Sequence, residues 1–234
     1  MTGGEGKALR LVVHDPTDRP NPRAWLGALK GTLGLPTDGT SGLSAGLSPA
    51  WWAGGLLHRV AGAADATFAA RSWGEALDWA TGTSERLGRP IGSLQAWGHG
   101  GWGFMRLGES RLDEAALRED HALADRLDAL RARLEGPESL VWLRCCSAFG
   151  GDVGRRFAAR AADRLGCRVG GHTYVIGVFQ SGTHVVRPGE VPAWDRLEGL
   201  SLDARGEPIG ARWSAPGEPS TISCLTLDAP ADAG

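Results

Sequence analysis

The sequence has no excess of charge of either sign. Its 25 Lys and Arg residues nearly balance its 27 Asp and Glu residues, which leaves a formal net charge of -2 at pH 7. No run of Lys and Arg is interleaved with aromatic residues, the pattern that follows a phosphate backbone. The composition therefore argues against nucleic acid as a partner.

Long apolar runs are missing as well. No segment approaches the ~20 consecutive apolar residues that a bilayer-spanning helix needs, so we expect no membrane partner. Residues Met1 to Gly6 are small and polar, and they lack the basic start and apolar stretch of an export signal. The sequence thus predicts a cytoplasmic protein.

Motifs for metals, nucleotides and disulfides are also absent. The cysteines at 145, 146, 167 and 224 form no CxxC, and no His and Cys residues stand at zinc-finger spacing. Adjacent Cys145 and Cys146 point to opposite faces if they lie in a strand, which fits reduced thiols better than a disulfide framework. The glycines around 31–46 are followed by no Gly-Lys-Ser/Thr and form no phosphate loop. No cofactor and no metal is implied.

What the sequence does contain is an alternation of strand and helix patterns. Hydrophobic residues make up 42% of the 234 residues, so we expect a single domain over 1–234, with a flexible loop region at 17–50 and a frayed tail at 228–234. Strands that alternate with helices favour an α/β protein of three αβα layers around a mostly parallel central sheet. The expected elements are strands 8–14, 91–97, 140–143, 168–178, 184–187 and 222–227, and helices 22–29, 73–87, 113–134 and 153–165. A hairpin or short irregular segment is expected over 102–112, with its turn at 108–109. Ser72 and Asp152 are the expected caps of the second and fourth helices, and Gly88 is the expected stop of the second.

Two polar motifs follow successive predicted strands. His99 comes directly after 91–97, and Cys146 comes shortly after 140–143. The carboxyl ends of parallel strands gather functional residues, and a thiol needs a base or a positive field to supply thiolate near neutral pH. The glycines around His99 allow close backbone approach, and the N–H groups of Gly100 and Cys146 are candidate donors to a developing oxyanion. We therefore expect a His99–Cys146 pair.

The same segments resemble caspase-like cysteine peptidases. Residues 91–101, ending in Trp-Gly-His-Gly-Gly, resemble the strand-His-Gly element of that family, and 140–154 resemble its nucleophile strand. Caspases place the His about 50 residues before the Cys. The match is closest to bacterial caspase-like domains. It implies a caspase-like fold and a thiol protease, a hydrolase of proteins or peptides, with Cys146 as nucleophile, His99 as base and Gly100 as oxyanion donor.

The resemblance has departures that matter. The Gln-Ala-Cys-x-Gly signature of true caspases is absent, because the matching stretch reads Leu-Arg-Cys-Cys-Ser over 143–147. Caspase specificity is therefore not implied, and Cys145 stays an alternative nucleophile. Cys145, Arg144, Trp102 and His172 are candidate substrate contacts. For Arg144, which can lower a thiol pKa or receive an acidic group, a structurally paired arginine is an equal alternative, and for His172 a histidine hydrogen-bonded in a strand is the favoured one.

Two other functions fit the same sequence. The first is a catalytically inactive caspase-like module that uses the same site to bind a peptide or a partner protein. The second is a scaffold protein whose ten tryptophans mediate assembly. The inactive module predicts that Cys146→Ala preserves the biological activity, whereas the peptidase predicts its loss. No feature of the sequence indicates a homo-oligomer.

Overall fold

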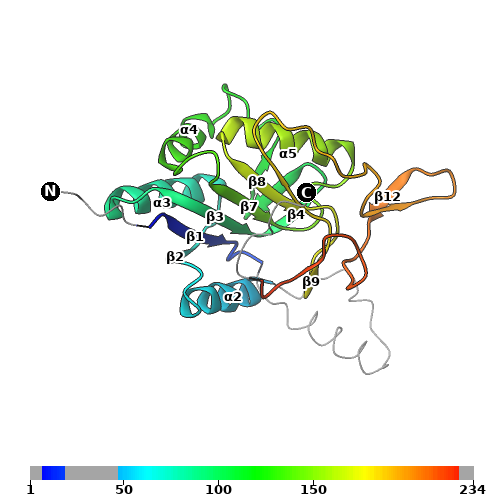
Figure 1. Ribbon diagram of the computed structural model, residues 1–234, viewed down its shortest axis with the longest axis horizontal. Coiled ribbons are helices and arrows are strands. Elements are labelled where there is room, and N and C mark those ends of the chain that lie inside the picture. Colours follow the sequence, from blue (N-terminus) through cyan, green and yellow to red (C-terminus); the bar gives the residue numbers. More distant parts are fainter. Residues whose placement is uncertain (1–6, 19–46, 227–234) are drawn as a thin grey trace.

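A computed structural model describes residues 7–18 and 47–226 (Figure 1). The predicted helix at 22–29, the predicted tail at 228–234 and most of the predicted loop at 17–50 lie outside these residues. Within the described ranges, no helix is both long enough and apolar enough to cross a membrane.

A six-stranded sheet forms the centre of the described chain. Its strands are β1 (Leu9–His14), β2 (Ala66–Ala69), β3 (Ile91–Trp97), β7 (Leu140–Arg144), β8 (Arg168–His172) and β10 (Thr183–Val186). They lie in the order β10-β8-β7-β3-β1-β2, and every neighbouring pair is parallel except β10 with β8. The expected mostly parallel central sheet is confirmed.

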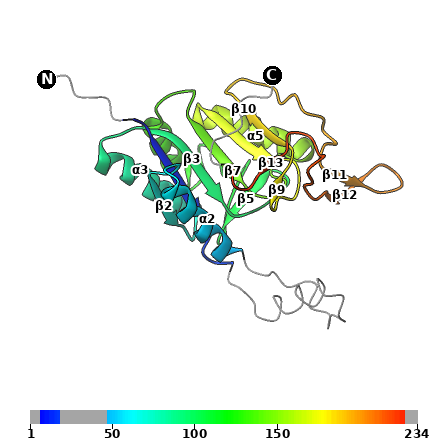
Figure 2. The ribbon, with the colours of Figure 1, turned by 60° about the horizontal axis from the view of Figure 1, so that its bottom comes forward.

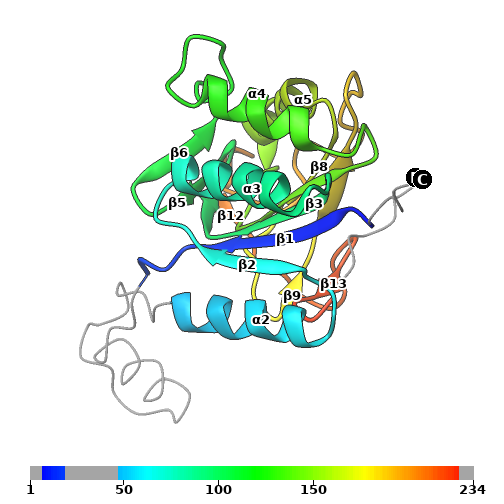
Figure 3. The ribbon, with the colours of Figure 1, turned by 90° about the vertical axis from the view of Figure 1, so that its left-hand side faces the viewer.

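Helices cover both faces of this sheet (Figure 3). They are α2 (Ser48–Val60), α3 (Trp73–Leu87), α4 (Ala124–Arg133) and α5 (Gly151–Leu165). Helices α3, α4 and α5 lie on one face, which we call the three-helix face. Helix α2 lies on the other, which we call the α2 face. This mixed α/β arrangement is compatible with a three-layer fold.

Short strands form three smaller sheets at the margins. They are β4 (His99–Gly101), β5 (Phe104–Leu107) and β6 (Ser110–Asp113) in one, β9 (Phe179–Gln180) with β13 (Ile222–Ser223) in another, and β11 (Leu200–Leu202) with β12 (Pro208–Ala211) in the third. The β11–β12 hairpin projects from the body of the molecule (Figure 2). Leu107 pairs with Ser110, so the predicted hairpin turn at residues 108–109 is confirmed.

Strand alternation sends different side chains to the two faces of the sheet. On the three-helix face, Leu11, Leu94 and Val141 are buried against apolar residues of the helices, among them Trp73 of α3 and Phe157 of α5. Each such side chain contributes ~1.5–3 kcal/mol by leaving water. This face therefore holds the main hydrophobic core.

Local signals set the ends of helix α3 as predicted. The Ser72 hydroxyl accepts a hydrogen bond from the Glu75 N–H at 3.1 Å, which satisfies one of the free donors of the first turn. At the other end, Gly88 adopts φ 61°, a left-handed conformation that glycine enters without steric cost.

Two predicted helix starts are corrected. Helix α4 begins at Ala124 rather than near residue 113, because the Asp113 carboxylate accepts the N–H groups of Ala115 and Ala116, both at 3.1 Å, and folds that segment into turns. Helix α5 has Gly150 at its N-cap and no side-chain cap, so Asp152 is a first-turn acid and not the cap. The negative charge of Asp152 still interacts favourably with the positive end of the helix dipole.

The later predicted strands are shorter than expected. The segment predicted as a strand over 168–178 ends as one at His172, and the segment 222–227 forms only the two residues of β13. The chain beyond His172 turns away because Thr173 and Tyr174 contact the segment 182–218 instead of a neighbouring strand.

Candidate active site

The sheet places the two predicted motifs side by side. Strands β3 and β7 are parallel neighbours, and Trp97 at the end of β3 pairs with Arg144 at the end of β7. His99 and Cys146 each follow these paired residues by two positions. Both motifs therefore leave the same edge of the sheet, where the carboxyl ends of parallel strands present functional groups.

Two glycines allow the His99 segment to fold against the cysteine segment. A Cβ on Gly98 would lie 2.5 Å from the Arg106 carbonyl oxygen, so only glycine lets β4 double back onto β5 at this point. A Cβ on Gly100 would lie 2.5 Å from the Sγ atom of Cys145 and 2.7 Å from the carbonyl oxygen of Cys146. The backbone of β4 is thus packed directly on the two cysteines.

The Gly100 N–H is left outside the β4–β5 ladder. Gly101 and Phe104 close a two-residue turn, so they form a pair that exchanges backbone hydrogen bonds. The next pair, Gly100 with Met105, is then of the alternate kind that exchanges none. The Gly100 N–H points away from β5, as an oxyanion donor requires.

The two adjacent cysteines differ sharply in exposure. Cys145 is 1% exposed, and burial raises the pKa of its thiol well above the ordinary value. Cys146 is partly exposed, and its Sγ lies 4.0 Å from the Ile176 carbonyl oxygen. Burial also raises the pKa of Cys146, although backbone hydrogen bonds of Ile176 and of Cys146 itself act in the opposite direction. Cys146 is therefore the sulfur that a reagent can reach, and it rests as a neutral thiol.

The residue after Cys146 has a strained backbone. Ser147 adopts φ 46°, a left-handed conformation that costs a non-glycine residue of order 1–3 kcal/mol. Two hydrogen bonds hold this turn in place: the Ser147 N–H donates to the Tyr174 carbonyl at 2.8 Å, and the Phe149 N–H donates to the His172 carbonyl at 3.0 Å. Such strain clusters at functional sites.

His99 contacts an acidic residue that the sequence reasoning did not single out. Its Nε2 atom lies 3.1 Å from the Asp18 Oδ2 atom, and the Trp51 ring meets the imidazole edge-on at a centroid distance of 5.3 Å. Asp18 follows β1 by four residues, at the same edge of the sheet. The rule that pointed to His99 and Cys146, applied to the first strand, would have named Asp15 and Asp18 together, without deciding between them.

The imidazole and the thiol do not hydrogen-bond to each other. Among the described residues, the polar contact of the His99 side chain is with Asp18, and that of the Cys146 thiol is with Ile176. The structure thus brings the two segments into contact without a direct bond between the two functional groups. Catalytic hydrogen bonds are often loose in a ligand-free site.

Arg144 lies in the interior, 4% exposed, and its polar contacts within the described residues are made to neutral oxygens. Its guanidinium donates to the Gln180 and Gln95 side-chain oxygens and to the carbonyls of Cys224 and Thr226, at 2.8 to 3.3 Å. Burial lowers its pKa to about 10. Because its donors are occupied, Arg144 joins β3, β7, β9 and the segment after β13, and a substrate acid would have to displace one of these oxygens.

The other two candidate substrate contacts lie apart from each other. His172 is 0% exposed, and its Nδ1 atom lies 3.1 Å from the Thr183 hydroxyl, which agrees with the interpretation of a histidine hydrogen-bonded in a strand. Trp102 is half-buried in the β4–β5 turn, and its ring packs so closely on Gly150 that a Cβ there would lie 2.8 Å from it. Trp102 therefore lies beside the loop that follows Cys146.

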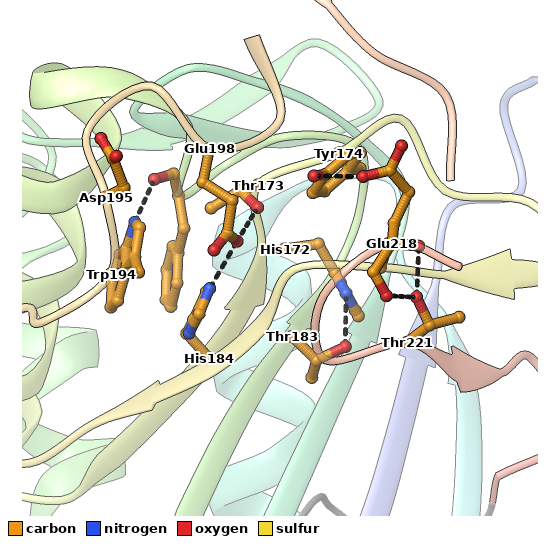
Figure 4. A network of polar contacts seen from close by, with 12 residues as sticks. His172, Thr173, Tyr174, Thr183, His184, Trp194, Asp195, Glu198, Glu218 and Thr221 are labelled. Atoms are coloured by element: carbon orange, nitrogen blue, oxygen red, sulfur yellow. Dashed lines mark hydrogen bonds and ion pairs between the residues drawn. The ribbon is translucent and has the colours of Figure 1, made fainter. Parts of the chain in front are cut away.

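A polar network supports this loop from outside (Figure 4). The Trp194 ring is stacked on both Phe149 and His184, and its Nε1–H donates to the Phe149 carbonyl at 3.2 Å. Glu198 accepts hydrogen bonds from the His184 Nε2 and the Thr173 hydroxyl, both at 2.7 Å. The segment 194–198 thus fixes Phe149, three residues after Cys146.

No group of three or more His, Cys, Asp or Glu residues in the described ranges is arranged to hold a metal ion. All four cysteines are free thiols. Comparison with models of known protein families finds no match to the chain, and comparison with curated proteins finds no similar sequence.

Proposed function

We propose that the chain is a caspase-like cysteine peptidase in which Cys146 attacks a peptide carbonyl with the help of His99. The observation that carries the proposal is the packing of β4 on the two cysteines, which brings the histidine segment and the thiol segment together at one edge of the sheet. The partly exposed thiol and the strained turn at Ser147 support it.

The proposed reaction is acyl transfer to sulfur followed by hydrolysis. His99 takes the proton of the Cys146 thiol as the S–C bond forms, and the carbonyl electron pair moves onto oxygen. The Gly100 and Cys146 N–H groups stabilise this oxyanion. The C–N bond then breaks while His99 returns the proton to the leaving amine. Water next attacks the thioester carbonyl as His99 takes a proton from it, the C–S bond breaks, and the sulfur receives this proton from His99.

The neutral thiol determines what His99 has to do. Since burial raises the pKa of Cys146, few molecules carry a resting thiolate at neutral pH. The proton must leave during the attack, so the base contributes to the rate of this step directly. A site of this kind depends more on its histidine than one with a preformed thiolate.

A specific observation favours the inactive module as the second candidate. Among the described residues the imidazole and the thiol share no hydrogen bond, and the raised thiol pKa reduces the fraction of Cys146 present as reactive thiolate. A caspase-like domain that binds a peptide without cutting it needs neither a hydrogen bond between the imidazole and the thiol nor a reactive thiolate.

The scaffold function has less support. Trp73, Trp97, Trp142 and Trp194 are buried and serve packing, whereas Trp52 and Trp213 are more than half exposed and lie on separate elements. The two strongly exposed tryptophans are therefore separate side chains and do not form one cluster among the described residues.

The test is proteolysis of a defined peptide library, with cleaved bonds identified by mass spectrometry. We expect cleavage by the wild type and its loss in Cys146→Ala and in His99→Ala. Cys224→Ala, another partly exposed cysteine, is the matched control and should cut like the wild type. Loss of cleavage in Cys145→Ala with activity retained in Cys146→Ala would move the nucleophile by one residue and overturn the assignment.

The same library separates the inactive module. That function predicts no cleavage by the wild type, together with capture of the same peptides by the wild type and by Cys146→Ala. Either result, equal capture without cleavage or cleavage that survives both substitutions, contradicts the peptidase.

A further inference from the structure

We propose that Asp18 is a positioning residue that fixes the tautomer of His99. Its carboxylate lies against Nε2 and favours the proton on that nitrogen, and this leaves Nδ1 as the nitrogen with a free electron pair for the thiol proton. The inference rests on the proposed peptidase function, in which His99 is the base.

The geometry at His99 supports this role directly. The Asp18 Oδ2 atom lies 3.1 Å from Nε2, and the Asp18 side chain is 12% exposed, so water competes little for the carboxylate. The same oxygen accepts the Leu47 N–H at 2.7 Å, which holds the carboxylate from a second direction. The edge-on Trp51 ring restricts rotation of the imidazole.

The sheet topology explains how three residues far apart in sequence meet. Strands β1, β3 and β7 are consecutive in the sheet, and all three run parallel. Asp18 follows the first, His99 the second and Cys146 the third, each at the carboxyl end. An acid, a base and a nucleophile therefore leave the same edge in the order in which a relay of hydrogen bonds needs them.

The tautomer decides whether the base works. A neutral imidazole carries one proton, and a carboxylate at Nε2 can only accept, so the proton stays on Nε2. Nδ1 then receives the proton from the Cys146 sulfur as the S–C bond forms. The resulting imidazolium carries a positive charge beside the carboxylate, which stabilises it until the proton passes to the leaving amine. No proton is transferred to Asp18 in these steps.

The decisive variant is Asp18→Asn. The Oδ2 position faces both Nε2 and the Leu47 N–H, so an asparagine places there either a neutral oxygen, which attracts the Nε2 proton less strongly, or an NH₂ group, which loses the Leu47 bond and favours the opposite tautomer. We expect two-bond ¹H–¹⁵N correlations at about pH 8.5, where an ordinary histidine is neutral, to show Nε2–H in the wild type and a smaller Nε2–H population, with Nδ1–H increased, in Asp18→Asn. Alkylation of Cys146 by iodoacetamide, followed by mass spectrometry, should slow ~100-fold at pH 7.

Two further variants distinguish a role of Asp18 in positioning His99 from a role in the stability of the fold alone. Asp18→Glu retains a carboxylate and should restore the Nε2–H tautomer and part of the alkylation rate. Asp120→Asn removes a carboxylate that pairs with Arg118 on the surface, and it should leave both readouts at wild-type values. Equal rates for Asp18→Asn and Asp18→Glu would contradict the proposal.

The outcomes keep this inference apart from the peptidase function. If His99→Ala slows the alkylation of Cys146 but Asp18→Asn changes neither the rate nor the tautomer, His99 is the base and the role of Asp18 is wrong. If His99→Ala leaves the alkylation rate unchanged, the proposed catalytic pair fails, whatever tautomer the spectrum shows.

Discussion

The two faces of the central sheet differ in chemistry although the same strands build both. On the three-helix face the strand residues are apolar, from Leu11 and Val13 of β1 to Leu143 of β7, and the helices cover them with apolar side chains. On the α2 face the alternate residues of the same strands include His14, Gln95, Trp142, Arg144 and His172, all buried. One face follows the usual rule for protein interiors and the other does not.

The α2 face also holds buried polar atoms whose hydrogen-bonding capacity is not met. Among the described residues, His14 Nδ1, His58 Nδ1, Trp142 Nε1 and His172 Nε2 have no hydrogen-bond partner. Each unmet group costs ~1–3 kcal/mol. The comparison suggests a division of roles: the three-helix face supplies stability, and the α2 face carries polar groups at a cost to stability.

The largest expected effect comes from breaking the three-helix face. Phe157→Ala removes a side chain that is 0% exposed between α5 and the sheet, and it should lower the free energy of unfolding by ~3–5 kcal/mol through lost burial and the cavity left behind. Urea denaturation measures it. Val153→Ala on the same helix, 45% exposed, is the control and should cost less than ~1 kcal/mol. Similar losses in the two variants would show that this face does not carry the core.

A smaller loss is expected from the polar hub of the α2 face. Arg144→Ala leaves the oxygens of Gln95 and Gln180 and two carbonyls without their donor, but it also removes a buried charge that has no acidic partner in the described chain. These effects oppose each other, so we expect a loss of ~2–3 kcal/mol, below that of Phe157→Ala. Urea denaturation of both variants in one buffer ranks the two losses of unfolding free energy. A larger loss in Arg144→Ala than in Phe157→Ala would contradict the difference between the faces.

The sequence predicted most of the sheet because short apolar runs and glycine stops are local signals. Ser72 and Gly88 bound α3 for that reason, whereas the start of α4 was wrong because apolar spacing alone does not distinguish the turns after Asp113 from a helix. His99 and Cys146 stand at strand ends that the pattern reveals. The contact of Asp18 with His99 depends on strand order, which no local pattern contains.

The faces should also respond differently to acid. Burial, and then the charge of Arg144, lower the pKa of His172 on the α2 face to about 3, against ~6.5 in the unfolded chain. Below pH 6.5 the unfolded state binds a proton that the native state excludes, so stability falls as the pH drops through the window from 6.5 toward 3. Between pH 7 and 5 this residue should cost ~2 kcal/mol.

The variant His172→Gln isolates this contribution, because it retains a polar group for Thr183 and cannot titrate. Its free energy of unfolding, measured by urea denaturation at both pH values, should fall by ~2 kcal/mol less than that of the wild type. A His172→Gln curve parallel to the wild type would mean that the α2 face does not exclude the proton.

The smallest effect is expected at the margin of the sheet, where the segment 194–198 reaches the loop after Cys146. Glu198→Gln weakens the hydrogen bonds to His184 and Thr173 by removing the carboxylate charge, and it should lower the free energy of unfolding by only ~1 kcal/mol. Because Trp194 packs on Phe149, amide hydrogen exchange over 147–150 should nevertheless become faster. If exchange there is unchanged while global stability falls, the segment supports the fold as a whole and not the loop beside the thiol.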